Sequence, residues 1–168
     1  MAEITLGGNP IHTNGDLPAP GSKAPAFEVV KSDFTTVSSD DLAGQRVLLN
    51  IFPSIDTGVC ATSVRTFNER AADLDDTTVV CVSADLPPAA GRFCAAEGIE
   101  NVITGSTFRS SFGEDYGVRM VDGKLEGLNA RSVVVLDRDG TVLHSELVPE
   151  IAQEPDYDAA IKALGSHG

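Results

Sequence analysis

Phe52-Pro53-Ser54-Ile55-Asp56-Thr57-Gly58-Val59-Cys60 is the stretch of sequence that decides the fold of this chain. It continues a nearly unbroken apolar run over residues 47–52, which is typical of a strand buried on both faces. Pro53 has no N–H to give to a neighbouring strand, so we expect the strand to end there. Asp56 or Thr57 can then cap a helix, because a short side-chain oxygen accepts hydrogen bonds from free amides of the first turn. The stretch predicts a strand, a tight loop and a helix.

The predicted helix carries an apolar stripe that begins at Cys60. Its members recur every three or four residues, as on one face of a helix: Cys60, Val64, Phe67, Ala71 and Leu74. Cys60 is therefore expected in the first helical turn, at the end of a buried strand, where α/β proteins usually place their chemistry. A thiolate there would meet unpaired amides and the positive end of the helix dipole. We interpret Cys60 as a candidate nucleophile rather than as a small buried apolar residue.

Length and composition limit the possible classes of protein. The chain has 168 residues, which fits one domain over residues 1–168 with a sizeable core. Helical and strand-like patterns alternate along it, which indicates the α/β class. The formal net charge of −13 disfavours partners such as nucleic acid and acidic membrane surfaces. No segment has the apolar length of a membrane span and the start lacks a secretory pattern, so we expect a cytoplasmic location.

The remaining segments alternate in type along the chain. A β-hairpin is expected around Gly7-Gly8-Asn9-Pro10, followed by an extended proline-rich connector over residues 16–26. Further strands are predicted at residues 27–30, 77–83, 101–104, 132–136 and 141–147. Further helical segments are predicted at residues 38–42, from Asp85 to Gly98 with Ala89, Phe93 and Ala96 on one face, within 111–116, and at 156–164.

Three cysteines in a chain without a secretory signal do not indicate a disulfide scaffold. Cys94 lies in the predicted helix that follows the one with Cys60, with a single strand between them. If the strands before these two helices are neighbours, both cysteines lie toward the same end of the sheet. Cys94 is then either a packed helix residue or a second reactive thiol. Cys81 lies within a predicted buried strand and is interpreted as structural, because apolar surroundings raise the pKa of a thiol.

Pro53-x-x-x-Thr57-x-x-Cys60 resembles the peroxidatic motif of the peroxiredoxins. The longer segments 50–60, Ser83-Ala84-Asp85-Leu86-Pro87 and Arg92-Phe93-Cys94 are similar to the thiol peroxidase subgroup, the atypical two-cysteine peroxiredoxins. The resemblance covers about residues 4–164. It implies a thioredoxin-like fold, with a central mixed sheet flanked by helices and an added N-terminal β-hairpin.

The same resemblance implies a function and assigns roles to five residues. Cys60 matches the peroxidatic cysteine and Cys94 the resolving cysteine, while Thr57, Pro53 and Arg131 match the residues that activate and shield the thiolate. A thiol-dependent peroxidase of this kind reduces hydrogen peroxide and organic hydroperoxides in antioxidant defence. Cys60 would become a sulfenic acid and then form an intramolecular disulfide with Cys94, to be recycled by thioredoxin. The resemblance also implies a homodimer and requires no metal or organic cofactor.

Two cysteines can be bridged only when their Cα atoms come within about 7 Å of each other. We expect Cys60 and Cys94 to start farther apart, since they occupy different helices. The bridge therefore predicts local unwinding around both residues during turnover.

Three other classes of protein are alternatives. A thioredoxin-type thiol–disulfide oxidoreductase would share the fold but needs Cys-x-x-Cys, and Ala61-Thr62-Ser63 follow Cys60. A cysteine hydrolase needs a histidine beside Cys60, and with His12 in the hairpin and His167 in the tail, His144 is the available partner. A zinc or redox-scaffold protein would need cysteines at metal-clip spacing, which this chain lacks.

Overall fold

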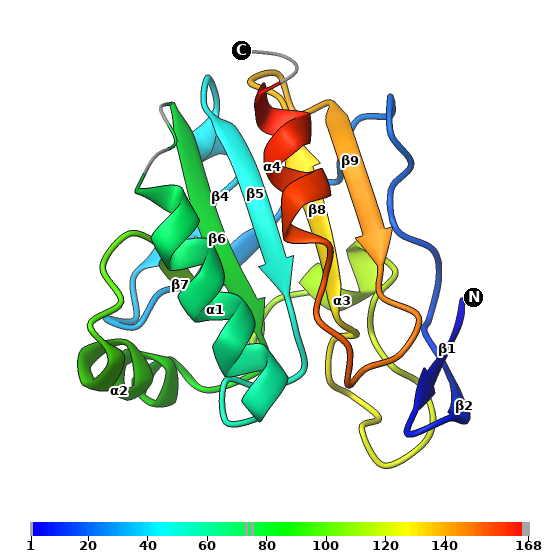
Figure 1. Ribbon diagram of the computed structural model, residues 1–168. Helices are drawn as coiled ribbons and strands as arrows, with labels where there is room; N and C mark the ends of the chain where they lie inside the picture. The colour runs from blue at the N-terminus through cyan, green and yellow to red at the C-terminus, as the bar shows by residue number, and fades with distance from the viewer. Residues whose placement is uncertain (1, 73, 75, 166–168) are drawn as a thin grey trace.

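The computed structural model describes residues 2–72, 74 and 76–165 of the chain. Within these residues the main sheet has the strand order β4-β3-β7-β6-β5-β8-β9, and β1 pairs with β2 in a separate hairpin (Figure 1). In chain order the strands are β1 (Glu3–Leu6), β2 (Asn9–His12), β3 (Glu28–Val30), β4 (Thr36–Ser38), β5 (Arg46–Ile51), β6 (Thr77–Ser83), β7 (Ile103–Ser106), β8 (Ser132–Leu136) and β9 (Val142–Leu147). The helical segments are the 3₁₀ turn η1 (Asp40–Leu42), α1 (Gly58–Ala71), α2 (Pro87–Glu97), α3 (Phe112–Asp115) and α4 (Tyr157–Gly165).

The main sheet is mixed, as predicted. β5, β6 and β7 run parallel, whereas β8 pairs antiparallel with β5 and β3 pairs antiparallel with β7. β5 lies between β6 and β8, and every residue of it is buried. The predicted strand that is covered on both faces is therefore confirmed. None of the helices in the described part of the chain combines the length and the apolar character that crossing a bilayer requires.

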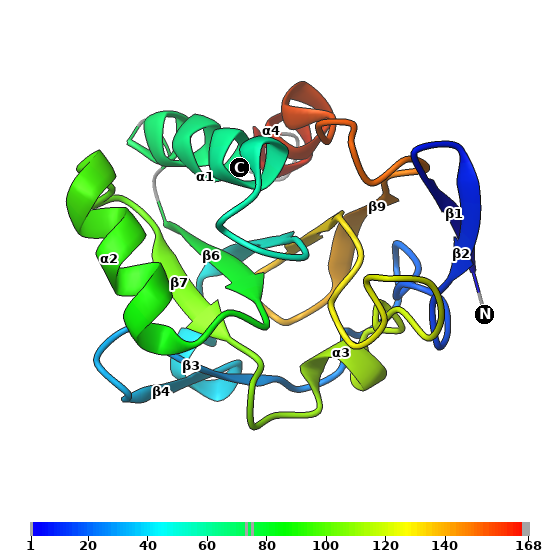
Figure 2. The same ribbon diagram turned by 90° about the horizontal axis from the view of Figure 1, so that it is seen from below.

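Two hydrophobic clusters lie on opposite faces of this sheet. Figures 1 and 2 show α1 and α4 over one face, where Phe67 and Leu164 belong to the same cluster as the strand residue Leu48. The next strand residue, Leu49, belongs to the other cluster, together with Phe112 of α3. This division follows from the strand backbone, because successive side chains point to opposite faces. Cys60 belongs to the cluster under α1 and α4.

The predicted helix stripe is confirmed from Cys60 to Ala71. Cys60, Val64 and Phe67 are fully buried on α1, and Ala71 is partly buried against the same cluster. Leu74 was predicted on the stripe but lies beyond the end of the helix, where it is partly buried against this cluster. The extended connector and the antiparallel pair of β8 and β9 are confirmed as well. The predicted turn at residues 38–42 contains η1, and the short strand β4 just before it was not predicted.

Two predictions about elements are wrong in detail. The strand expected at residues 101–104 begins two residues later and continues through Gly105. The strand does not end at this glycine, which is required by packing. A Cβ atom at Gly105 would come within 2.4 Å of Val29 Cγ2 on β3. Its missing side chain lets β3 lie against β7. On α2, Ala96 is exposed, and the face toward the sheet carries the buried Ala90 instead.

The N-terminal hairpin is confirmed and packs against the main body. Its turn is formed by Gly7 and Gly8, both with positive φ (58° and 84°), a conformation that glycine adopts without strain. Ile4 and Ile11 form a satellite cluster with residues from later in the chain, Met120, Ala130 and Ile151. The hairpin therefore lies beside the loop that follows β9.

Candidate active site

The first turn of α1 carries Cys60, as predicted. Thr57 precedes the helix with an extended backbone (φ −111°, ψ 149°), and its carbonyl accepts the first helical hydrogen bond from the Ala61 amide at 2.9 Å. The Cys60 side chain is fully buried. Its thiol therefore lies near the free amides and the positive end of the α1 dipole, out of contact with bulk water.

Arg131 is the side chain that contacts the Cys60 sulfur. Its Nη2 atom donates to Sγ at 3.3 Å, and its Nε donates to the carbonyl oxygen of Ile151 at 2.8 Å. Arg131 is 2% exposed, and its Nη1 has no hydrogen-bond partner within the described residues. A guanidinium in this place stabilises a thiolate and keeps further N–H groups for a bound oxygen.

Pro53 and Thr57 line a cavity of about 350 Å³ together with Arg131. The other walls of this cavity are largely apolar and include Leu6 from the hairpin and Leu125 from the loop before β8. Pro53 is buried and follows β5, where it ends the strand as predicted. The structure thus brings Pro53, Thr57 and Arg131 to one cavity, and Arg131 also donates a hydrogen bond to the Cys60 sulfur.

Thr57 does not make the capping hydrogen bond that the sequence allowed for either Asp56 or Thr57. Thr57 does occupy the cap position, but its hydroxyl donates to the carbonyl oxygen of Ser54 at 2.9 Å instead of accepting from a helix amide. The Thr57 amide is directed to the same carbonyl, at 3.3 Å, so the tight turn of residues 54–57 decides where the hydroxyl points. The hydroxyl oxygen still has lone pairs with which it can accept a hydrogen bond.

Cys94 lies apart from this group of residues. It is half-buried on α2, and burial raises the pKa of its thiol, an effect that a hydrogen bond with Thr104 of β7 partly opposes. All three cysteines are free thiols. Cys81 is buried in β6, where loss of solvation raises its pKa to about 12. This supports the structural reading of Cys81, because so high a pKa leaves almost no thiolate at neutral pH.

Comparison with known proteins agrees with this geometry. The family model described as Redoxin matches residues 19–161. A thiol peroxidase from Mycobacterium tuberculosis is 62% identical over 99% of this chain and all of that protein, and one from Corynebacterium glutamicum is 56% identical over 98% and 99%. The crystal structure of a peroxiredoxin-like protein from Aquifex aeolicus superposes with a TM-score of 0.94, at 36% identity, covering 99% of this chain and 97% of that one.

The chain belongs to the redoxin family. It is a peroxiredoxin-type enzyme with a thiol peroxidase function, as the resemblance in sequence predicted. The predicted thioredoxin-like fold with an added N-terminal hairpin is confirmed as well.

The alternatives to a redoxin find no support at Cys60. His144 lies on β9 opposite Val135. His12 forms ion pairs with Glu3 and Asp122 in the hairpin region. The side chain that contacts the Cys60 sulfur is Arg131. His167 lies outside the described residues. Within the described part of the chain no His, Cys, Asp and Glu side chains are grouped so that they could hold a metal ion.

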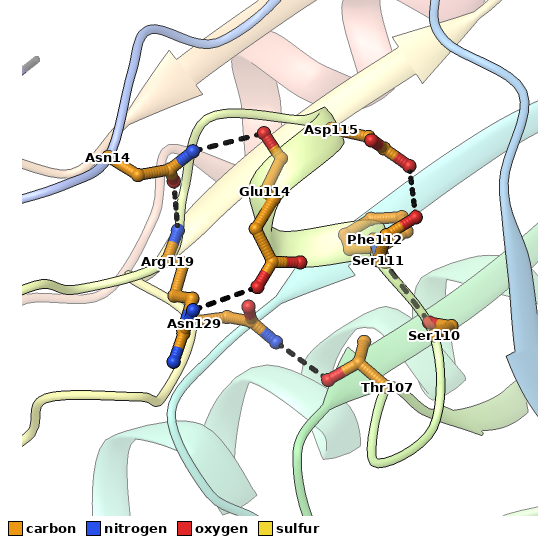
Figure 3. A network of polar contacts seen from close by, with 9 residues as sticks. All are labelled: Asn14, Thr107, Ser110, Ser111, Phe112, Glu114, Asp115, Arg119 and Asn129. Atoms are coloured by element: carbon orange, nitrogen blue, oxygen red, sulfur yellow. Dashed lines mark hydrogen bonds and ion pairs between the residues drawn. The ribbon is translucent and has the colours of Figure 1, made fainter.

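A network of polar contacts includes Asn129, in the segment that leads to Arg131 (Figure 3). Asn129, two residues before Arg131, is buried and donates to Thr107 Oγ1 at 3.3 Å. Nearby, Arg119 donates to Glu114 at 3.0 Å, and its amide donates to the side chain of Asn14 at 3.0 Å (Figure 3). These contacts join the segment after β2, α3, the segment after β7 and the segment before β8.

Two contributors to the site were missed in the sequence. The carbonyl of Ile151 orients Arg131, but any residue supplies a carbonyl, so no signal in the sequence could have found it. Asp85 binds the loop before Cys60 through its carboxylate. Its signal was present, because an acidic residue lies two positions after the end of β6, the parallel neighbour of β5.

Proposed function

We propose that Cys60 reduces hydrogen peroxide and organic hydroperoxides through a sulfenic acid and an intramolecular disulfide with Cys94. The observation that carries the proposal is the contact of Arg131 Nη2 with Cys60 Sγ, 3.3 Å, at the start of a helix and beside an apolar cavity. Such an arrangement combines a stabilised thiolate with donors for an oxygen substrate. The resemblance to peroxiredoxins assigns the same roles.

In the first step, the Cys60 thiolate attacks the terminal oxygen of the hydroperoxide. A sulfur–oxygen bond forms, the oxygen–oxygen bond breaks, and the alkoxide or hydroxide takes up a proton and leaves as alcohol or water. The free Nη1 of Arg131 and the first amides of α1 stabilise the negative charge that develops on the leaving oxygen. The Thr57 hydroxyl accepts a hydrogen bond from the hydroperoxide, and Pro53 keeps water from the thiolate.

In the second step, the Cys94 sulfur attacks the sulfenic sulfur of Cys60, and water leaves as the disulfide forms. Cys60 is fully buried and Cys94 is bound to Thr104, so both must move before the sulfurs meet. We propose that the first turn of α1 and the Cys94 region of α2 unwind for this step. A thioredoxin dithiol then reduces the bridge by exchange, without a metal or an organic cofactor.

The apolar walls of the cavity support organic hydroperoxides as substrates. Leu6, Leu125 and Leu128 line it next to Pro53, and a bulky alkyl group would bury apolar surface there. The rate constant for cumene hydroperoxide is expected to exceed that for hydrogen peroxide, and Leu125→Ser is expected to lower the first more than the second. Equal rate constants in the parent protein would remove this support.

Mass spectrometry after one equivalent of peroxide tests the mechanism. The parent is expected to carry a Cys60–Cys94 bridge, and Cys94→Ser is expected to trap a sulfenic acid at Cys60. Cys81→Ser is the matched control and should form the same bridge as the parent. A bridge that includes Cys81, or unimpaired peroxide consumption by Cys60→Ser, contradicts the proposal.

The resemblance also supports a cytoplasmic homodimer, and we propose both. Light scattering coupled to gel filtration measures the mass in solution, which should be twice that of the 168-residue chain. A monomeric mass at micromolar concentration argues against the dimer and leaves the chemistry of Cys60 untouched.

A further inference from the structure

Asp85 joins two segments that belong to different cysteines. It lies in the loop between β6 and α2, the helix with Cys94. One carboxylate oxygen accepts from the Ser54 hydroxyl and the other from the Ile55 amide, both at 2.7 Å. The Ser83 hydroxyl also donates to the carboxylate, at 2.7 Å. One carboxylate therefore ties the loop before Cys60 to the start of the Cys94 helix.

The backbone of Asp85 is itself held by two hydrogen bonds. Its amide donates to Ser83 Oγ at 3.3 Å, and its carbonyl accepts a hydrogen bond from the hydroxyl of Ser106 on β7. Asp85 is thus anchored to the ends of β6 and β7, which belong to the central sheet. Ser54 and Ile55, by contrast, lie in an irregular loop, and the carboxylate gives that loop a rigid support.

The second step of the proposed mechanism needs this loop to change its conformation. The Ser54 carbonyl accepts from the amide and the hydroxyl of Thr57, the cap residue of α1, so the loop and the first turn of the helix are continuous in their hydrogen bonds. When the first turn unwinds, the contacts of Ser54 and Ile55 with the carboxylate are strained or lost. Hydrogen bonds to a carboxylate are among the stronger ones in proteins.

We propose that Asp85 is a positioning residue that holds the Cys60 loop closed and thereby sets how readily Cys60 opens toward Cys94. This inference rests on the proposed function. With the carboxylate in place, Cys60 and Arg131 keep the geometry that reacts with peroxide. Weakening the hydrogen bonds of this carboxylate with Ser54 and Ile55 favours the open loop, in which the first turn of α1 is unwound. Disulfide formation then becomes faster, while the reaction with peroxide becomes slower.

Asp85→Asn tests the inference because it keeps the shape of the side chain but turns one acceptor into a donor. Asp56→Asn is the matched control, since it removes a carboxylate from the same loop at an exposed position. Rapid quenching with a thiol-blocking reagent, followed by mass spectrometry, gives the rate of Cys60 oxidation in the Cys94→Ser background and the rate of bridge formation with Cys94 present. Mass spectrometry is chosen because the chain has no tryptophan whose fluorescence could report the two steps.

For Asp85→Asn we expect bridge formation to be about tenfold faster and Cys60 oxidation about tenfold slower, the size of effect that losing one charged hydrogen bond produces. The ratio of the two rates should be unchanged in Asp56→Asn. Under excess peroxide, Asp85→Asn should also accumulate less sulfinic acid, because Cys94 captures the sulfenic acid sooner. Rates that are unchanged, or that fall by the same factor, overturn the role of Asp85.

Ser54→Ala provides a second test that does not alter the carboxylate. It removes one donor to Asp85 and should shift both rates in the same directions, by less, and add nothing further when combined with Asp85→Asn. Additive effects of the two substitutions overturn the inference. A parent protein that forms no Cys60–Cys94 bridge contradicts the proposed function itself, whereas a normal parent with an unchanged ratio in Asp85→Asn rejects only the role of Asp85.

Discussion

Arg131 contacts both the loop after β9 and the cysteine to which we assign the chemistry. It donates to the Ile151 carbonyl with Nε and to the Cys60 sulfur with Nη2, and it is almost fully buried. The planar guanidinium makes both contacts at a fixed separation, which a flexible ammonium group cannot do. At the scale of the residue, the position of the charge matters as much as the charge itself.

Arg131→Lys is therefore expected to lower the rate constant of Cys60 with peroxide by about 10²-fold, the cost of losing one preorganised donor. Stopped-flow competition with a reporter peroxidase measures this rate constant. Arg65→Lys is the control, because Arg65 forms an exposed ion pair with Glu97. A lysine variant with the parent rate constant would show that charge alone suffices.

Cys81 gives a prediction for pH at the same scale. Burial raises its pKa to about 12, from the ordinary thiol value of 9.0. Below pH 9 the thiol is protonated in both folded and unfolded chains, and its contribution to stability is fully present. As the pH rises from 9 toward 12, the unfolded chain releases this proton while the folded chain keeps it, so stability falls by up to about 1.4 kcal/mol per pH unit.

Urea unfolding of the parent and Cys81→Ala at pH 8 and pH 10 checks this prediction. Cys81→Ala is expected to be less stable at pH 8, because it leaves a small cavity in β6. The difference between the two proteins should shrink at pH 10, where only the parent loses the contribution of Cys81. A constant difference across both pH values speaks against the buried thiol as the cause.

At the scale of the elements, the sheet depends on how closely its strands approach each other. Gly105 of β7 leaves room for the side chain of Val29 on β3. β3 pairs antiparallel with β7 and so extends the sheet beyond the parallel strands β5, β6 and β7. β7 also carries Thr104, the partner of Cys94, and Ser106, which fixes the backbone of Asp85. The packing of β7, between β3 and β6, thus reaches the residues around both cysteines.

Gly105→Ala is expected to destabilise the protein by about 1–3 kcal/mol, as overpacking in a core does. The added Cβ would come within 2.4 Å of Val29 Cγ2, so a smaller partner should relieve the clash. Urea unfolding should show that Gly105→Ala costs less in a Val29→Ala background than in the parent. Equal costs in both backgrounds would assign the loss to the backbone of Gly105 instead.

At the scale of the whole molecule, the hairpin and the body share the support of Arg131. The Thr5 amide donates to the Pro149 carbonyl at 2.8 Å, and the Ile151 amide donates to the Thr5 carbonyl at 2.9 Å. Glu150 completes this junction, because its carboxylate accepts from the Gly8 amide (2.9 Å) and the Thr5 hydroxyl (3.0 Å). The hairpin thereby holds the loop whose carbonyl orients Arg131.

Glu150 should make this junction sensitive to acid. Hydrogen bonds from the amides of Ala152 and Gly8 lower its pKa to about 2, from the ordinary glutamate value of 4.5. A lowered pKa means that the contribution to stability is present above pH 4.5 and is lost as the pH falls toward 2. We expect protection against amide hydrogen exchange in β1 and β2, relative to the unfolded chain, to fall over this range more than protection in β6.

Glu150→Gln is the matched variant for this test. It should show faster exchange in the hairpin already at pH 5 and a weaker dependence on pH below that value. Glu126→Gln, in the exposed loop before β8, should behave like the parent protein. Hairpin exchange that keeps the parent's pH dependence without the carboxylate would refute the assignment to Glu150.

The local order of strand, loop and helix, and with it the place of Cys60 in a first helical turn, could be read from the amino-acid sequence. These features depend on neighbours in the chain: an apolar run, Pro53 at its end, and a stripe of helical spacing. Sequence patterns also placed the hairpin, the antiparallel pair of β8 and β9, and α4. Resemblance to a family pointed to Arg131 and Cys94, which local patterns left undecided.

Only the tertiary structure decided which distant residues meet. Arg131 and Cys60 are 71 residues apart, and Asp85 lies 30 residues from Ile55, so their contacts depend on the order of strands in the sheet. That order follows from burying both faces of β5 together, which no single segment encodes. The same packing decided that Gly105 continues a strand, because Val29 on β3 leaves no room for a side chain at this position.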